Sequence, residues 1–324
     1  MPRKYRTATL LVPLFAASCA TLPDTSGYTS ATIGVRQAAA AAGELAQAQI
    51  DTAADTFRDA ESQRSVRESG EAFGGAWATM LRSMDAAVAY AESLEAITHA
   101  GNSGAGSARA VADSVSTLAT TLGVTIGPVA GAITDTATFL NTQIANIRAS
   151  RSLARSLDAA DPAIVRLQTI MSGQIAAARL TYTRAFNAER RTIEADTGLG
   201  FYFLQDVAME REEKNQQALL DDAVLTPERS ARIAPVKARL AAIRAARAGL
   251  TNGLARYQAA TDNLAARRKA GLMVFAAADD AVAAWSAAHI RLSAGVRNRR
   301  PITFAALDAA ADNLRQVLQT WRSL

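Results

Sequence analysis

Cysteine and histidine are scarce in this chain, and their scarcity excludes several common kinds of catalytic and metal site. The 324 residues include one cysteine and two histidines. A zinc site built from several Cys and His ligands, an iron–sulfur cluster and a disulfide framework all need more of these residues. The sequence also has no phosphate-binding loop, nucleophile elbow or calcium-binding loop. It therefore predicts no metal, no cofactor and no enzymatic activity.

Proline and aromatic residues are also few, whereas alanine is abundant. The chain has 8 prolines, 6% aromatic residues and 75 alanines. Alanine has the highest helix propensity, while aromatic and β-branched residues favour strands. We expect an all-α protein, built as an elongated antiparallel bundle or as coiled-coil-like hairpins of about seven to nine helices.

The first eighteen residues have the pattern of an export signal. Arg3, Lys4 and Arg6 form a basic start, and the uncharged, mostly apolar segment 7–18 follows. Such a segment is typical of a signal peptide and is too short to span a bilayer permanently. Removal of residues 1–18 would lower the formal charge from +5 to +2, so we expect no nucleic-acid partner.

The sequence FAASC at 15–19 resembles the lipobox of bacterial lipoproteins, in which small residues precede a cysteine that becomes the mature N-terminus. The resemblance implies cleavage between Ser18 and Cys19 and attachment of fatty-acyl chains such as palmitate to Cys19. Each buried CH₂ of those chains contributes about 0.8 kcal/mol to membrane binding. The residue after this cysteine, Ala20, resembles the one found in lipoproteins that are sorted to the outer membrane. The resemblance implies that the protein is anchored in the inner leaflet of that membrane and faces the periplasm. An ordinary secretory signal with a chance cysteine is the alternative.

The mature chain is predicted to have a short tether and one helical body. Residues 19–30 are rich in polar turn-forming residues and are expected to form a flexible tether. Residues 31–324 are expected to form the periplasmic bundle, with a sub-boundary near 197–203. We expect one long helix over 31–69, which glycines near 70–75 interrupt.

A second helix boundary is predicted at Asp161 and Pro162. Asp favours the N-cap position, and Pro fits the first turn of a helix, where its missing N–H is not needed. We therefore expect a helix to begin there and to end near residue 196.

The clearest periodicity is a heptad series over 236–264, with polar interruptions at Arg247 and Thr261. Residues 227–270 carry a net charge of +8, and residues 203–222 carry −4. Either the acidic helix packs beside the basic one, or a basic face contacts anionic lipid, peptidoglycan or a protein partner. The residues of this basic face that flank the seam are Arg232, Lys237, Arg239 and Arg244.

The longest uncharged run covers residues 114–134. Gly123, Gly127 and Gly131 repeat within it at every fourth position, around Pro128. This spacing faintly resembles the glycine zippers of some outer-membrane lipoproteins and the apolar hairpin tips of helical pore-forming toxins. Three interpretations stay open: a buried turn between helices, a tip that contacts another protein, and a hairpin that inserts into a membrane.

Together these features predict a membrane-anchored periplasmic lipoprotein with a structural or adaptor role in the cell envelope. Its expected partners are the membrane, through the acyl chains, and another envelope protein, and oligomers are compatible with the sequence. The alternative function is a membrane-active, pore-forming-like protein that inserts the hairpin at 114–134.

Overall fold

The computed structural model describes residues 24–55, 57, 59–101, 104–125, 130–195 and 198–323. Within these residues the chain forms eight α-helices and one 3₁₀ turn, with no strand. The predicted all-α class is therefore confirmed. The elements are α1 (Ser26–Asp55), α2 (Ala60–His99), α3 (Ala105–Thr125), α4 (Ala130–Ala149), α5 (Leu153–Glu194), α6 (Gly200–Leu225), η1 (Pro227–Arg232), α7 (Ile233–Asn298) and α8 (Ala305–Arg322).

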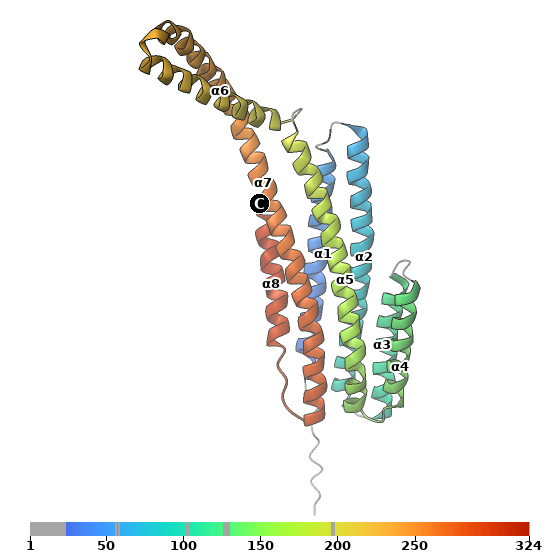
Figure 1. Cartoon of the computed structure of the whole chain (residues 1–324). Helices are drawn as coiled ribbons and strands as arrows, with labels where there is room; N and C mark the ends of the chain where they lie inside the picture. Colours follow the sequence, from blue (N-terminus) through green and yellow to red (C-terminus); the bar gives the residue numbers. More distant parts are fainter. Residues whose placement is uncertain are drawn as a thin grey trace, which may run out of the picture.

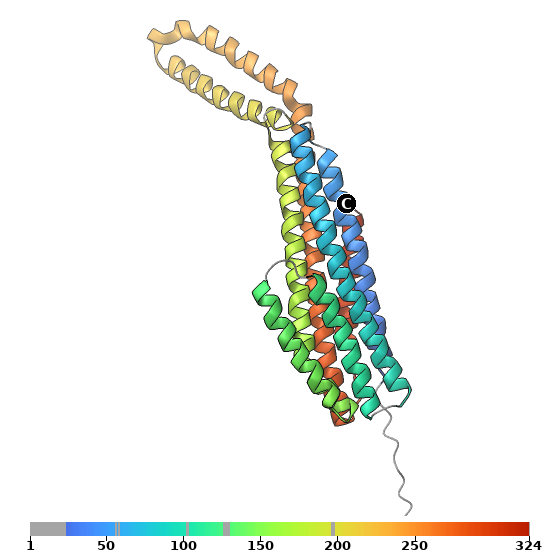
Figure 2. The ribbon, with the colours of Figure 1, turned by 90° about the vertical axis from the view of Figure 1, so that its right-hand side faces the viewer.

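Five helices form an elongated bundle, and two hairpins extend from it. Helices α1, α2, α5, α8 and the C-terminal half of α7 run side by side along the long axis (Figure 1). The shorter α3–α4 hairpin packs against α2 and α5 (Figure 2). Helix α6 and the N-terminal half of α7 form a second hairpin, which projects from one end of the bundle and which we call the arm.

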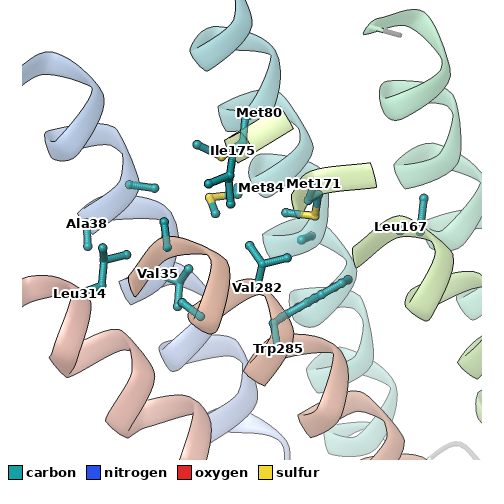
Figure 3. Close-up of a cluster of buried hydrophobic side chains, with 14 of the residues drawn as sticks. Val35, Ala38, Met80, Met84, Leu167, Met171, Ile175, Val282, Trp285 and Leu314 are labelled. Carbon is teal, nitrogen blue, oxygen red and sulfur yellow. The ribbon is translucent and has the colours of Figure 1, made fainter. Parts of the chain in front are cut away.

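The core of the bundle receives side chains from all five of its helices. Tight packing is possible because the buried face of α1 is largely alanine, and small side chains shorten the distance between helix axes. Figure 3 shows how larger residues from the other helices fill the interior beside α1. Its labelled core residues are Val35, Ala38, Met80, Met84, Leu167, Met171, Ile175, Val282, Trp285 and Leu314.

The predicted single helix over 31–69 is wrong, because the chain turns back between α1 and α2. The Asp59 carboxylate begins α2 by accepting a hydrogen bond from the Ser62 backbone N–H at 2.7 Å. This turn lets α1 and α2 pack side by side and bury their apolar faces. The glycines at 70–75 lie inside α2 and do not interrupt it.

The predicted helix start at Asp161 and Pro162 is also wrong, because α5 begins at Leu153. The Ser152 hydroxyl caps this helix by accepting from a backbone N–H in its first turn. Leu153 and Leu157 are both 1% exposed, so the residues before Pro162 already belong to the core. Burial of these residues outweighs the hydrogen bond that a proline inside a helix removes.

The predicted tether 19–30 extends too far, because α1 already begins at Ser26. The Ser26 backbone N–H donates to the Asp24 carboxylate at 2.9 Å. Tyr28 is fully buried, and its ring lies 5.6 Å from that of Phe304. Residues 26–30 therefore belong to the bundle.

Candidate functional sites

Most residues of the lipobox and glycine-rich predictions lie outside the described residues. This applies to Ser18, Cys19, Gly127 and Pro128. Gly123 lies near the end of α3, and Gly131 lies near the start of α4. The described part of the run therefore belongs to the two helices of one hairpin.

The α3–α4 hairpin lies against the bundle along much of its described length. Val111, Val115 and Leu118 of α3 and Ile147 of α4 are fully buried, and Leu140 of α4 is nearly so. These side chains belong to the hydrophobic core, since α3 packs against α2 and α5, and α4 packs against α5. Insertion of residues 114–134 into a membrane would expose this apolar surface unless the whole hairpin rearranged.

One helical stretch of the described chain, Glu228–Asn298, is long and apolar enough to cross a membrane. Its most apolar 18-residue window has a mean hydropathy of 1.2, and 56% of that window is buried inside the protein. Helices α5 and α8 pack against α7. Core packing accounts for this apolarity, so it is weak support for a membrane span.

The acidic and basic helices pack together as the two sides of the arm. Arg247 lies in the heptad seam of α7 and meets the Asp206 carboxylate at 2.9 Å and that of Glu213 at 2.8 Å. Arg244 also donates to Glu213 at 2.7 Å. Hydrogen bonds from Arg244 and Arg247 lower the pKa of the Glu213 carboxyl. The polar interruption in the predicted seam is therefore matched by acids on α6.

A heptad series on α6 faces the seam of α7. It could have been recognised in the sequence from its four–three spacing, although the acids within it obscure the apolar pattern. Tyr202 of this series packs over Gly253 of α7 so closely that a Cβ at Gly253 would overlap its ring. The series comprises Tyr202, Asp206, Met209, Glu213, Gln216, Leu220 and Ala223.

The predicted basic face is divided between paired and unpaired side chains. Arg244 pairs with Glu213, as above, and Arg239 lies 3.7 Å from the Glu212 carboxylate. Arg232 and Lys237 are exposed, and neither forms an ion pair with another described residue. Half of the face thus holds the arm together, and the other half lies open near its tip.

Helix α6 has an unusual surface, because most of its large apolar residues are exposed. Seven of the twelve exposed large hydrophobic residues in the described chain lie on this one helix. Leu225, at the tip of the arm, is 82% exposed. Contiguous exposed apolar surface commonly marks an interaction site. The seven residues are Phe201, Phe203, Leu204, Val207, Leu219, Val224 and Leu225.

A groove lies where the arm leaves the bundle. It encloses about 1400 Å³ between the start of α2, the end of α5, the start of α6 and the middle of α7. Its lining includes three acids and three arginines together with aromatic and aliphatic side chains. The charged lining residues are Asp59, Glu61, Glu189, Arg191, Arg256 and Arg267.

Part of the groove is lined by a buried ion pair that joins α5 to α7. Arg267 donates from Nη2 to the Glu189 carboxylate at 2.6 Å and from Nε to Asn263 at 2.7 Å. The Glu189 side chain is 5% exposed and that of Arg267 is 16% exposed. Glu189 Oε2 has no hydrogen-bond partner within the protein, which is costly for a buried carboxylate oxygen.

A buried polar cluster inside the bundle was not predicted from the sequence. The Tyr90 hydroxyl of α2 lies 2.5 Å from Nε2 of His289 on α7, and both residues are 0% exposed. On the other side of the imidazole, Nδ1 lies 3.0 Å from Asp161 Oδ1, although the two are not aligned as a hydrogen bond. Burial raises the pKa of the Tyr90 phenol, so its hydroxyl stays protonated and can donate to His289.

Removing the Tyr90 hydroxyl is expected to destabilise the bundle. Tyr90→Phe leaves the buried His289 Nε2 without a partner, at a cost of about 1–3 kcal/mol. The double variant Tyr90→Phe with His289→Leu should lose less than the sum of the two single losses, because both partners are then apolar. Urea unfolding of the three variants measures this coupling. Tyr257→Phe is the control, and full additivity of the two losses would contradict the contact.

No metal cluster accompanies these sites. In the part of the chain that the structure describes, no group of three or more His, Cys, Asp or Glu side chains could hold a metal ion. Comparison of the chain with protein-family models, curated proteins and solved structures finds no match.

Proposed function

We propose that the protein is a lipid-anchored adaptor of the bacterial cell envelope. In this proposal, acylated Cys19 attaches the chain to the inner leaflet of the outer membrane. The bundle acts as a spacer in the periplasm, and the arm contacts another envelope protein through helix–helix packing. The lipobox-like sequence supports the anchor, and the geometry of the arm supports the contact.

The start of the helical body and the arm lie at opposite ends of the bundle. The Thr25 hydroxyl lies 2.8 Å from that of Thr98, near the C-terminal end of α2. The first turn of α2 instead lines the groove at the base of the arm. Because α2 has 40 residues at about 1.5 Å each, these ends are roughly 60 Å apart. An anchor preceding α1 would therefore leave the arm facing away from the membrane.

The exposed apolar surface of α6 is the main support for the proposed contact. A two-helix arm buries little apolar area, and on α6 only Gly200 and Ala223 are buried. Apart from ring contacts such as that of Phe203 with Tyr257, its exposed apolar residues are left uncovered by this chain, and a helical partner could cover them. The paired charges in the seam meanwhile fix how α6 and α7 align.

Site-specific photo-crosslinking in bacterial cells tests this proposal. A photoreactive amino acid at Leu204 or Leu219 on the arm is expected to give discrete adducts to an envelope protein. Val165 and Leu180 on α5 are similarly exposed controls, at 42% and 52%, and should give none. Equal adducts from arm and control positions would contradict an arm-specific contact, and an adduct at twice the mass of the chain would identify a second copy as the partner.

The anchor is tested separately. A fatty-acid analogue fed to the cells should label the unmodified chain and not Cys19→Ala, and the arm adducts should be lost in that variant. Equal labelling of the two would exclude lipidation at Cys19. Leakage of liposomes caused by the unmodified chain and abolished by Gly127→Leu would instead favour the membrane-active alternative.

A further inference from the structure

The groove at the base of the arm combines charges of both signs with no net charge. Its acids Asp59 and Glu61 come from the start of α2, and its arginines Arg191 and Arg256 come from α5 and α7. With the Glu189–Arg267 pair included, the groove has three acids and three arginines, so their formal charges sum to zero. Such a groove suits a ligand that has no net charge and offers both hydrogen-bond donors and acceptors.

The Glu189–Arg267 pair adds a specific requirement. The Glu189 carboxylate is buried and holds Arg267 in place by accepting from its Nη2. Arg267 uses Nε and Nη2 in its bonds to Asn263 and Glu189, and its side chain is 16% exposed, which leaves Nη1 to donate to a ligand in the groove. The carbonyl oxygen of an amide group placed beside the pair could accept from this nitrogen.

Aromatic side chains form the other part of the lining. Phe57, Phe201 and Tyr202 all line the groove, and Phe201 is 44% exposed. The flat faces of such rings pack well against the C–H faces of sugar rings. Planar carboxylate, amide and guanidinium groups can form two hydrogen bonds at once to neighbouring hydroxyls of a sugar. A hydrocarbon chain would leave the polar lining without partners.

We propose that this groove binds an oligosaccharide, a chain of neutral sugars carrying hydroxyl and acetamido groups. The aromatic residues stack on the sugar rings, and Arg256 and Asn263 bind hydroxyls. Arg267, which Glu189 holds in place, donates to the carbonyl oxygen of an acetamido group. This activity is additional to the adaptor role and depends neither on the lipid anchor nor on the partner of the arm.

The test uses two defined probes, the tetramer of N-acetylglucosamine and the tetramer of glucose. Binding is measured by saturation-transfer NMR and calorimetry on the full chain, in micelles of a detergent without a sugar headgroup. We expect saturable binding and about tenfold tighter binding of the acetamido tetramer, a difference of about 1.4 kcal/mol. Equal affinity for the two tetramers would overturn the role given to the Glu189–Arg267 pair.

Matched variants locate the binding. Phe201→Ala and Arg256→Gln should each weaken binding by about tenfold or more. The controls are Phe139→Ala, at a residue 38% exposed on α4, and Arg179→Gln, at an exposed position of α5. All four replaced side chains are at least partly exposed, so each variant is expected to keep the helical circular dichroism of the unmodified chain.

Three results would overturn the proposal. The first is the absence of saturable binding of both tetramers. The second is binding that the groove variants and the control variants affect equally. The third is that a blocked trialanine peptide binds and the tetramers do not, which would assign the groove to a polypeptide.

Discussion

Gly43→Ala is expected to destabilise the bundle by about 3 kcal/mol, because α1 and α2 touch at this residue. A Cβ at Gly43 would overlap the indole ring of Trp77. That indole is 4% exposed and donates from Nε1 to the Ala39 carbonyl at 3.0 Å. The ring would have to move, losing this hydrogen bond and disturbing its contact with Phe275, whose ring centroid lies 5.6 Å away. Urea unfolding followed by circular dichroism measures the loss.

The matched control for this variant is Gly75→Ala on α2. No atom lies within 4 Å of the Cβ position at Gly75, so alanine should stabilise the helix by about 0.5–1 kcal/mol. Trp77→Phe is a second check, since a smaller ring leaves room for the added methyl group. In that background Gly43→Ala should cost less than it does alone. An unchanged midpoint for Gly43→Ala would show that the helices are not in contact there.

The helical class was predictable because it follows from composition, whereas helix boundaries depend on packing. Ala-rich segments without proline indicate helix at every position, so propensity alone could not locate the turn before α2. Only the cap at Asp59 marks that turn. At Pro162 the opposite error was made, because a helix start was predicted where the chain is already helical. Asp161 and Pro162 have the local pattern of a helix start, but the residues before them are buried as part of α5. Tertiary burial decided both cases.

The arm was the most predictable of the candidate sites, because its charges lie close together along the chain. Opposite net charges on two neighbouring segments indicated that they pair, and Arg247 does lie between Asp206 and Glu213. The contact between Tyr90 and His289 spans 199 residues of sequence. No local spacing could indicate it, and the same holds for the groove, whose walls come from four helices.

The polar seam explains how the arm can serve as a presenting element with little core of its own. Charged seam positions stabilise a coiled coil less than apolar ones do, but they disfavour misaligned pairings. Because Asp206 and Glu213 are seven residues apart, a one-heptad slip of α6 along α7 would leave Arg247 with only one of its two acids. The arm therefore favours one alignment even though most of the large apolar residues of α6 are exposed.

Arg267→Met is expected to destabilise the protein by about 3–5 kcal/mol, because it leaves the Glu189 carboxylate buried without its partner. The side chain of Glu189 is only 5% exposed, so water cannot replace the guanidinium without opening the packing of α5 against α7. The guanidinium also lies 5.5 Å from the centre of the Phe186 ring, and this contact would be lost too. Urea unfolding measures the change.

The double variant Arg267→Met with Glu189→Leu separates the loss of the ion pair from the loss of packing. Apolar replacement of both members of a buried pair is often nearly neutral, so we expect the double variant to regain most of the lost stability. Arg179→Met, at an exposed position of α5, should change stability by less than about 0.5 kcal/mol. If the double variant were as unstable as Arg267→Met, the damage would come from lost packing around the guanidinium rather than from an unpaired charge. The stability of the junction between bundle and arm would then depend on the shape of Arg267 and not on its ion pair.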